Sequence, residues 1–203
     1  MQLFVDMDGV LADFDAHYQN LFGVRPDKTT NNVEWKLIRR TKDFYLNIPP
    51  MPDFPELWGC IAKYNPIVLT GIPWSIAEAA DNKRAWGRKH LGVDVEVRCC
   101  PSRDKCLHAA PGDILIDDWE KYQSLWVERG GVWITHRSAA ETIRELKNHR
   151  LNSNGKSAEP SDSERVTNLM DVLRASLQRA QGAQQNDLGL HRPRAGRQAS
   201  PSA

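Results

Sequence analysis

Five short apolar runs separated by helical patterns constrain the fold of this chain more than any other feature. The runs are rich in Val and Ile and predict strands at Leu3–Asp6, Ile67–Thr70, Val95–Arg98, Ile114–Asp117 and Val132–Thr135. Helices are predicted at Ser75–Leu91, at Trp119–Arg129 and from Ser138 to Arg150. Strands that alternate with helices form parallel sheets covered on both faces. The sequence therefore predicts a Rossmann-like, three-layer α/β domain over residues 1–150 with a mostly parallel sheet.

Two segments do not fit that alternation. About sixty residues separate the first two strands, which is too long for one crossover helix, and insertions of that kind usually cover a functional site. We therefore predict a small helical cap at residues 14–55. After residue 150 the composition changes, and one amphipathic helix is predicted within an appended segment, residues 151–182. Its stripe either docks on the main domain or forms a partner surface, and residues 183–203 are predicted to be disordered.

Charge and composition exclude several classes of protein. The chain has 27 Lys and Arg against 26 Asp and Glu, so a net charge of +1 argues against nucleic acid as a partner. No apolar stretch is long enough to span a membrane, and acids stand where a signal peptide needs apolar residues. We expect a cytoplasmic protein with reduced thiols. A zinc site is not expected, because the spacing of its candidates fits no standard pattern: Cys99, Cys100, Cys106 and His108.

Two predicted strands end in closely spaced acids. Asp6 and Asp8 follow the first strand, and Gly9 then allows a sharp turn. Asp117 and Asp118 end the fourth strand. Because ligands bind beyond the carboxyl ends of parallel strands, we expect all four acids at one site. Acids in such positions also serve as turn or helix-capping residues, but four at one edge repel each other, and a divalent cation such as Mg²⁺ removes that conflict.

A third strand end supplies groups that suit a phosphate. Thr70 and Gly71 offer a hydroxyl and backbone amides, and Lys105 lies in a later loop. A hydroxyl, a free N–H and an ammonium group would form a phosphate cradle beside the metal. Each of these residues also has an ordinary structural explanation, so their joint order along the chain carries the interpretation.

The motifs in this order resemble those of the haloacid dehalogenase-like phosphatases. Asp6-x-Asp8-Gly9-Val10-Leu11, Leu69-Thr70-Gly71, Lys105 and Asp117-Asp118 look like the four motifs of that superfamily. The string from Asp6 to Phe14 is similar to the 5'(3')-deoxyribonucleotidase branch, as are Lys83-x-Ala85-Trp86 and Arg103-Asp104-Lys105. The resemblance covers residues 1–150 and is weaker in the cap. It implies a phosphatase that removes phosphate from deoxyribonucleoside monophosphates.

The resemblance also implies a role for each motif residue. Asp6 would be the nucleophile that forms an aspartyl-phosphate, and Asp8 would be the general acid and base. Mg²⁺ would be held by Asp6, the Asp8 carbonyl and Asp117, with Asp118 in support. Thr70, Gly71, Lys83 and Lys105 would bind phosphate oxygens.

The same resemblance implies a base or sugar pocket, with alternatives left open. The candidate pocket residues are Phe14, Trp35, Phe44, Tyr45, Trp74 and Arg103. Aromatic residues are often core instead, and the chain departs from its relatives at Gly71 and Trp74, where they have serine and lysine. One alternative is a phosphatase for another small phosphomonoester such as a phosphosugar. Another is a non-catalytic protein that binds nucleic acid or a partner, although the acid set is intact. The resemblance also favours a homodimer.

Overall fold

A five-stranded parallel sheet forms the centre of the described chain. The computed structural model describes residues 1–27 and 32–153. All neighbouring strands are parallel, in the order β3-β2-β1-β4-β5. The predicted α/β class and parallel sheet are therefore confirmed. The strands are β1 Leu3–Val5, β2 Ile67–Gly71, β3 Val97–Cys100, β4 Ile114–Asp117 and β5 Val132–Thr135.

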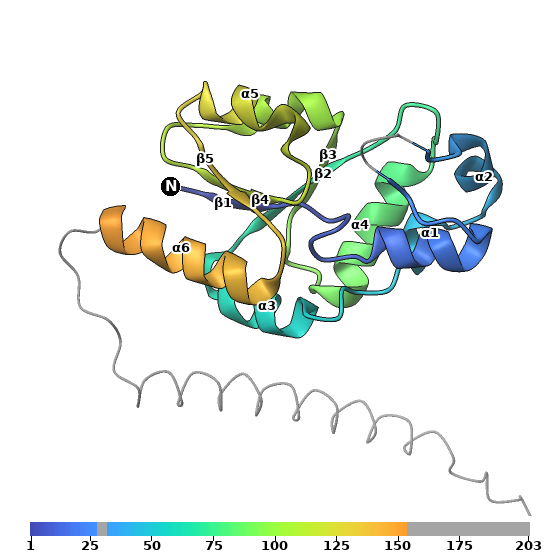
Figure 1. Cartoon of the computed structure of the whole chain (residues 1–203), viewed down its shortest axis with the longest axis horizontal. Coiled ribbons are helices and arrows are strands. Elements are labelled where there is room, and N and C mark those ends of the chain that lie inside the picture. Colours follow the sequence, from blue (N-terminus) through green and yellow to red (C-terminus); the bar gives the residue numbers. More distant parts are fainter. Residues whose placement is uncertain (28–31, 154–203) are drawn as a thin grey trace, which may run out of the picture. The chain divides into compact units, whose positions relative to one another are not determined.

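Helices cover both faces of this sheet (Figure 1). The view places α5 on one side of the strands and both α3 and α6 on the other, where α3 and α6 are in contact. The α-helices are α1 Phe14–Phe22, α2 Trp35–Arg40, α3 Phe54–Ile61, α4 Ala79–His90, α5 Gln123–Val127 and α6 Ala139–Ser153. The 3₁₀ helices are η1 Tyr45–Asn47, η2 Ala62–Tyr64, η3 Ser102–His108 and η4 Glu120–Tyr122.

Successive strand residues pack into two different cores because their side chains alternate between the faces of the sheet. On β1, Leu3 and Val5 join the larger core, to which α3, α4 and α6 contribute. Phe4 points the other way and meets the ring of Trp126 on α5, with centroids 5.5 Å apart. Both faces of the sheet are thus buried, which is why its central strands are continuously apolar.

The third strand begins two residues later than predicted. The sequence predicts Val95–Arg98, whereas β3 spans Val97–Cys100. Its register is set by pairing with β2, which matches Val68 with Val97 and Gly71 with Cys100. The register depends on contacts with β2, which the local apolar pattern does not reveal. The prediction from that pattern therefore began the strand too early.

Two predicted helices begin later than expected. The helix predicted from Ser75 begins at Ala79, because Ile76 first donates a turn hydrogen bond to the Pro73 carbonyl. The helix predicted at Trp119–Arg129 is divided into η4 and the short α5. Trp119 itself is extended, and its N–H donates to Oδ1 of Asp117 at 2.9 Å. The Asp117 side chain therefore accepts from the backbone N–H at the start of this segment.

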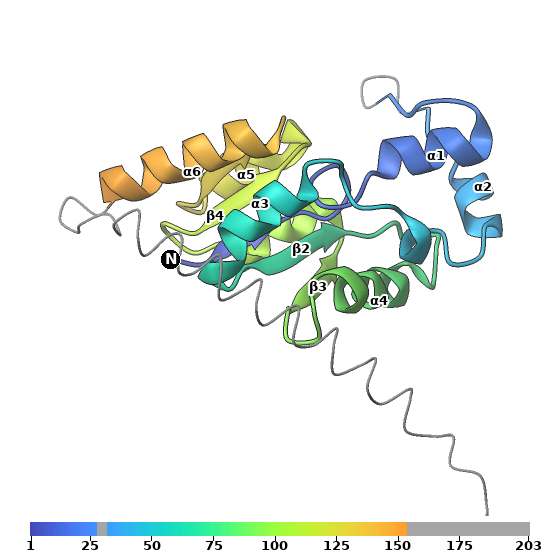
Figure 2. The same ribbon diagram turned by 90° about the horizontal axis from the view of Figure 1, so that it is seen from below.

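The segment predicted as a cap contains α1, α2 and η1. Figure 2 shows α1 and α2 together at one end of the molecule, beside the sheet. The Asp13 side chain caps α1 by accepting from Ala16 N at 3.0 Å. The segment is tied to α4 by Trp86, whose buried indole N–H donates to the Ile48 carbonyl at 2.7 Å.

The predicted C-terminal amphipathic helix and residues 183–203 lie outside the described residues. Within the described ranges, none of the helices combines the length and apolar character that crossing a bilayer demands.

Candidate active site

The backbone after β1 brings Asp6 and Asp8 to the carboxyl edge of the sheet. Asp6 N–H donates to the Ile116 carbonyl of β4 at 2.8 Å, so Asp6 still follows the sheet. The chain then folds back, since the N–H groups of Leu11 and Ala12 both donate to the Met7 carbonyl at 2.9 and 2.8 Å. Asp6 is buried and Asp8 is half-buried. A tight loop thus presents two carboxylates from one short segment.

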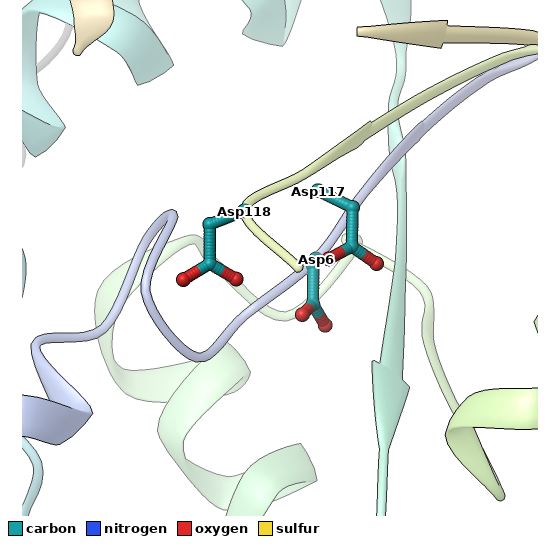
Figure 3. A group of neighbouring side chains, drawn as sticks. All are labelled: Asp6, Asp117 and Asp118. Atoms are coloured by element: carbon teal, nitrogen blue, oxygen red, sulfur yellow. The ribbon is translucent and has the colours of Figure 1, made fainter. Parts of the chain in front are cut away.

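Three acids from two strand ends gather at this edge. Figure 3 shows Asp6 after β1 beside Asp117 and Asp118 at the end of β4, with their carboxyl groups close together. One oxygen from each of the three lies within 4.8 Å of the others. The sequence predicted this convergence because the carboxyl ends of parallel strands share one edge of the sheet. The structure adds that β1 and β4 are neighbours in the sheet.

Gly9 lets Asp118 approach the loop. Its φ is +77°, a left-handed conformation that L side chains rarely adopt. A Cβ at this position would also collide with the Asp118 carboxylate. Both the turn and the place of the third acid therefore depend on a residue without a side chain.

Replacing Gly9 by alanine is expected to weaken divalent-cation binding about tenfold and to lower the free energy of unfolding by about 1–3 kcal/mol. Calorimetric titration with the cation and chemical denaturation measure the two effects. Gly23→Ala is the matched control, because Gly23 has the same φ of +77° but nothing within 4 Å of its Cβ position. Equal cation affinity in the two variants would contradict the role given to the Asp118 contact.

Lys105 neutralises part of the acid cluster. Its ammonium lies 2.6 Å from Oδ2 of Asp117 and 3.0 Å from Oδ1 of Asp6. Burial by itself lowers the pKa of Lys105, but the two carboxylates outweigh burial and hold the pKa above its ordinary value. Lys105 is therefore a permanent positive charge between the acids of the two strands.

The single positive charge of Lys105 does not offset the repulsion among the three carboxylates. Burial raises the pKa of the Asp117 carboxyl, and repulsion from Asp6 raises it further, although Lys105 counteracts both. A divalent cation would remove this repulsion, and three carboxylates are the hard oxygen donors that such a cation selects. Asp6, Asp117 and Asp118 could therefore hold a metal ion.

The buried ammonium group of Lys83 holds the Asp8 carboxylate in position. Its ammonium donates to Oδ2 of Asp8 at 2.7 Å, to the Thr70 hydroxyl at 2.9 Å and to the Gly71 carbonyl at 2.7 Å. All three of its donors are thus engaged, and the Lys83 side chain is 1% exposed. Burial raises the pKa of the Asp8 carboxyl, although Lys83 counteracts part of that rise.

The residues predicted to bind phosphate therefore lie in different environments. Thr70 and Lys83 are completely or almost completely buried and do not line the cleft above the acids, whereas Gly71 does. Lys105 lines a small inner cavity with Asp6 and Asp117. Sequence reasoning brought the right residues to this edge but did not distinguish those that face the cleft from those that support it.

A cleft of about 740 Å³ lies above the acids. Phe14, Trp35 and Tyr45 line one wall and belong to the predicted cap, residues 14–55, which we call the inserted segment. Trp74 and Arg103 line the cleft from the loops that follow the strands. These five predicted pocket residues are thus brought together around Asp6 and Asp8.

Phe44, the sixth predicted pocket residue, is not among the residues that line this cleft. It is 1% exposed and packs against the rings of Phe14, His17, Phe22 and Tyr45, with centroids 4.8–6.2 Å apart. The reason is that its apolar ring completes the core of the inserted segment. The prediction that Phe44 faces the pocket is therefore wrong.

Sequence reasoning missed several cleft residues, of which Trp119, Tyr122 and Ser102 bear on the site. Trp119 and Tyr122 form a T-shaped pair with centroids 5.7 Å apart, and Ser102 begins η3. Trp119 directly follows the acid pair, which is a signal that could have found it. Ser102 has no such signal, because its proximity to the site depends on how η3 packs against β2.

A parallel sheet with paired acids after β1 and β4 and a buried lysine between them is the arrangement that the resemblance to the haloacid dehalogenase-like phosphatases predicts. No protein-family model matches the chain. A structural comparison aligns it with L-2-haloacid dehalogenase from Xanthobacter autotrophicus at 11% identity and a TM-score of 0.42, covering 72% of this chain and 82% of that one.

The sequence is similar to proteins named as deoxyribonucleotidases. It is 29% identical over 143 residues to mitochondrial 5'(3')-deoxyribonucleotidase of Mus musculus, and the match covers 58% of this chain and 64% of the mouse protein. It is 26% identical over 144 residues to a Bordetella pertussis protein provisionally named 5'(3')-deoxyribonucleotidase, covering 58% of this chain and 74% of that protein. The chain thus spans less than two thirds of the mouse relative. The chain is therefore similar in sequence, at less than 30% identity, to proteins named 5'(3')-deoxyribonucleotidase.

Proposed function

We propose that this protein is a Mg²⁺-dependent phosphatase that hydrolyses deoxyribonucleoside monophosphates through an aspartyl-phosphate. The observation that carries the proposal is the cluster of Asp6, Asp117 and Asp118 below a cleft with aromatic walls, with Lys105 bound to Asp6 and Asp117. Similarity to relatives named 5'(3')-deoxyribonucleotidase supports the choice of substrate.

Asp6 attacks phosphorus in this mechanism. Its carboxylate lines the cleft, and Lys105 at 3.0 Å holds it in position. The bond from phosphorus to the leaving oxygen breaks as the bond to the Asp6 oxygen forms. Water then attacks the same phosphorus and releases Asp6 and inorganic phosphate.

Asp8 transfers the protons. Oδ2 of Asp8 is engaged by Lys83, whereas Oδ1 has no hydrogen-bond partner in the part of the chain that the structure describes. Oδ1 is therefore available to give a proton to the leaving oxygen and to take one from the attacking water. The raised pKa of Asp8 favours its acid form in the first of these steps.

Asp6, Asp117 and Asp118 would hold Mg²⁺, which, when bound, offsets negative charge on the acids and on the phosphate. The buried Lys105 ammonium contributes to the same electrostatic balance. The cleft walls formed by Phe14, Trp35 and Tyr45 would enclose the base.

The proposal is tested with a panel of phosphomonoesters. Purified protein is assayed for phosphate release from deoxyribonucleoside 5'- and 3'-monophosphates, ribonucleotides and sugar phosphates, with Mg²⁺ and after treatment with a chelator. We expect hydrolysis to be fastest for deoxyribonucleotides and to stop when Mg²⁺ is removed. A preference for sugar phosphates would overturn the substrate class, and absence of all turnover would favour a binding protein.

The aromatic wall makes a separate prediction. Trp35→Ala is expected to raise KM for a deoxyribonucleotide several-fold or more, because stacking on a base contributes about 1–3 kcal/mol. Activity toward p-nitrophenyl phosphate should change little. Trp35 is 37% exposed, so its removal should leave the free energy of unfolding nearly unchanged.

Phe44→Ala provides the contrasting variant. Because Phe44 is 1% exposed, this change should lower the free energy of unfolding by about 3–5 kcal/mol. If Trp35→Ala reduced both activities equally by unfolding the protein, Trp35 would be a core residue. If neither activity changed, the base would bind elsewhere.

A further inference from the structure

Ser102 occupies the space beside Gly71 that a side chain would otherwise fill. A Cβ built on Gly71 would overlap the Ser102 hydroxyl, and the rest of the Ser102 side chain lies just beyond it. Gly71 is the last residue of β2, and Ser102 begins η3. The glycine at the end of the strand therefore makes room for a hydroxyl that comes from a different loop.

Backbone conformation does not require the glycine at this position. The described glycines with positive φ are Gly9, Gly23, Gly92, Gly112 and Gly130, and Gly71 is not among them. Gly71 also pairs in regular parallel register with Cys100. Close approach of Ser102 is thus the physical reason for a glycine here.

Ser102 lines the two cavities beside Asp6, where the proposed function places the substrate phosphate. It lines the main cleft together with Asp6, Asp8 and Gly71. It also lines the inner cavity of about 30 Å³ together with Asp6 and Lys105. In the proposed mechanism, the phosphorus atom that Asp6 attacks lies beside these two cavities, and its other oxygens extend toward their lining residues.

Both predicted ammonium donors on that side are already engaged. The three hydrogens of the Lys83 ammonium have protein acceptors, and the Thr70 hydroxyl is one of them. Lys105 is bound by two carboxylates. A phosphate dianion needs further donors, and a hydroxyl that lines both cavities supplies one.

We propose that the Ser102 hydroxyl donates a hydrogen bond to a non-transferring oxygen of the substrate phosphate, and that Gly71 is glycine so that this hydroxyl can reach it. The inference rests on the proposed phosphatase function and adds a substrate-binding residue to it. Ser102 stays in place while the phosphoryl group moves to Asp6, so the contact assists both binding and transfer.

The test is a set of substitutions at the two positions. Ser102→Ala should lower kcat/KM roughly 10- to 100-fold and weaken binding of inorganic phosphate, because hydrogen bonds to charged groups have effects of this order. Ser102→Thr keeps the hydroxyl and should retain more activity than Ser102→Ala. Ser124→Ala, on the exposed face of α5, is the matched control and should behave as wild type.

Exchange of the two residues separates the hydroxyl from simple packing. Ser102→Gly alone removes the hydroxyl, and Gly71→Ser alone meets the Ser102 side chain. The double variant Gly71→Ser with Ser102→Gly returns a hydroxyl to the same space and should recover activity about tenfold over Ser102→Gly. Gly71→Ala with Ser102→Gly fills the space without a hydroxyl and should not recover it.

Two measurements decide the outcome: kcat/KM and the affinity for inorganic phosphate measured by calorimetry with Mg²⁺ present. Ser102→Ala within twofold of wild type in both would overturn the inference, and so would equal recovery by alanine and serine at position 71. Absence of hydrolysis by the wild type would overturn the proposed function alone. In that case, loss of phosphate binding in Ser102→Ala would still support the contact.

Discussion

Replacing Asp6 by asparagine is expected to lower turnover of every phosphomonoester by a factor of about 10⁴ or more, because an amide cannot act as the nucleophile. The fold should persist, since asparagine has nearly the same volume and Lys105 keeps its 2.6 Å contact with Asp117. Steady-state kinetics and thermal unfolding measure the two parts of the prediction. Asp81→Asn, at a side chain that is 87% exposed, is the control and should leave both unchanged.

Two results would bear directly on the role of Asp6. Residual activity of Asp6→Asn within about tenfold of wild type would contradict its assignment as nucleophile. Positive support would come from beryllium fluoride bound to Asp6 in the wild type as a mimic of the aspartyl-phosphate, and absent in Asp6→Asn. Asp8→Asn should still bind the mimic but slow both chemical steps.

Replacing Lys83 by methionine is expected to affect stability and turnover together. The change leaves the Asp8 carboxylate, the Thr70 hydroxyl and the Gly71 carbonyl without their shared donor. We expect the free energy of unfolding to fall by about 3 kcal/mol, as happens when one partner of a buried ion pair is removed. Turnover should fall about 100-fold in the protein that remains folded, because Asp8 loses its anchor.

A second lysine on the same helix provides the control. Lys89 is exposed on α4, so Lys89→Met should change neither the free energy of unfolding nor turnover. Lys83→Arg keeps the charge, but its planar guanidinium does not match three acceptors around one nitrogen, and it should restore stability only in part. A Lys83→Met protein as stable and active as wild type would show that Asp8 does not need this anchor.

Lys83 also connects Tyr45 to the site. The Lys83 ammonium lies 4.8 Å from the centre of the Tyr45 ring, so one cation contacts Asp8, the end of β2 and the inserted segment. Burial raises the pKa of the Tyr45 hydroxyl, and the nearby Asp8 raises it further, so this residue remains neutral. The inserted segment thus contacts the catalytic edge through a neutral ring.

Sequence alone determined the sheet and the convergence of its acids. Strands that end in Asp6 and Asp117 bring their carboxylates together whenever they are parallel neighbours, and the apolar pattern predicts parallel strands. The order of groups along the chain also predicted Thr70 and Lys105 at this edge, whereas Lys83 was predicted only by the resemblance to the phosphatase family. The predictions made from the residues themselves depend on strand period and chain direction, which are local properties.

Only the tertiary structure decided which side chains face the cleft. Phe44 and Trp35 are both aromatic residues of the inserted segment, yet one is buried in its core and the other lines the cleft. Ser102 reaches the site because η3 packs against β2 beside a glycine. Burial and close approach depend on contacts between residues distant in sequence, and no pattern within a short stretch of chain encodes them.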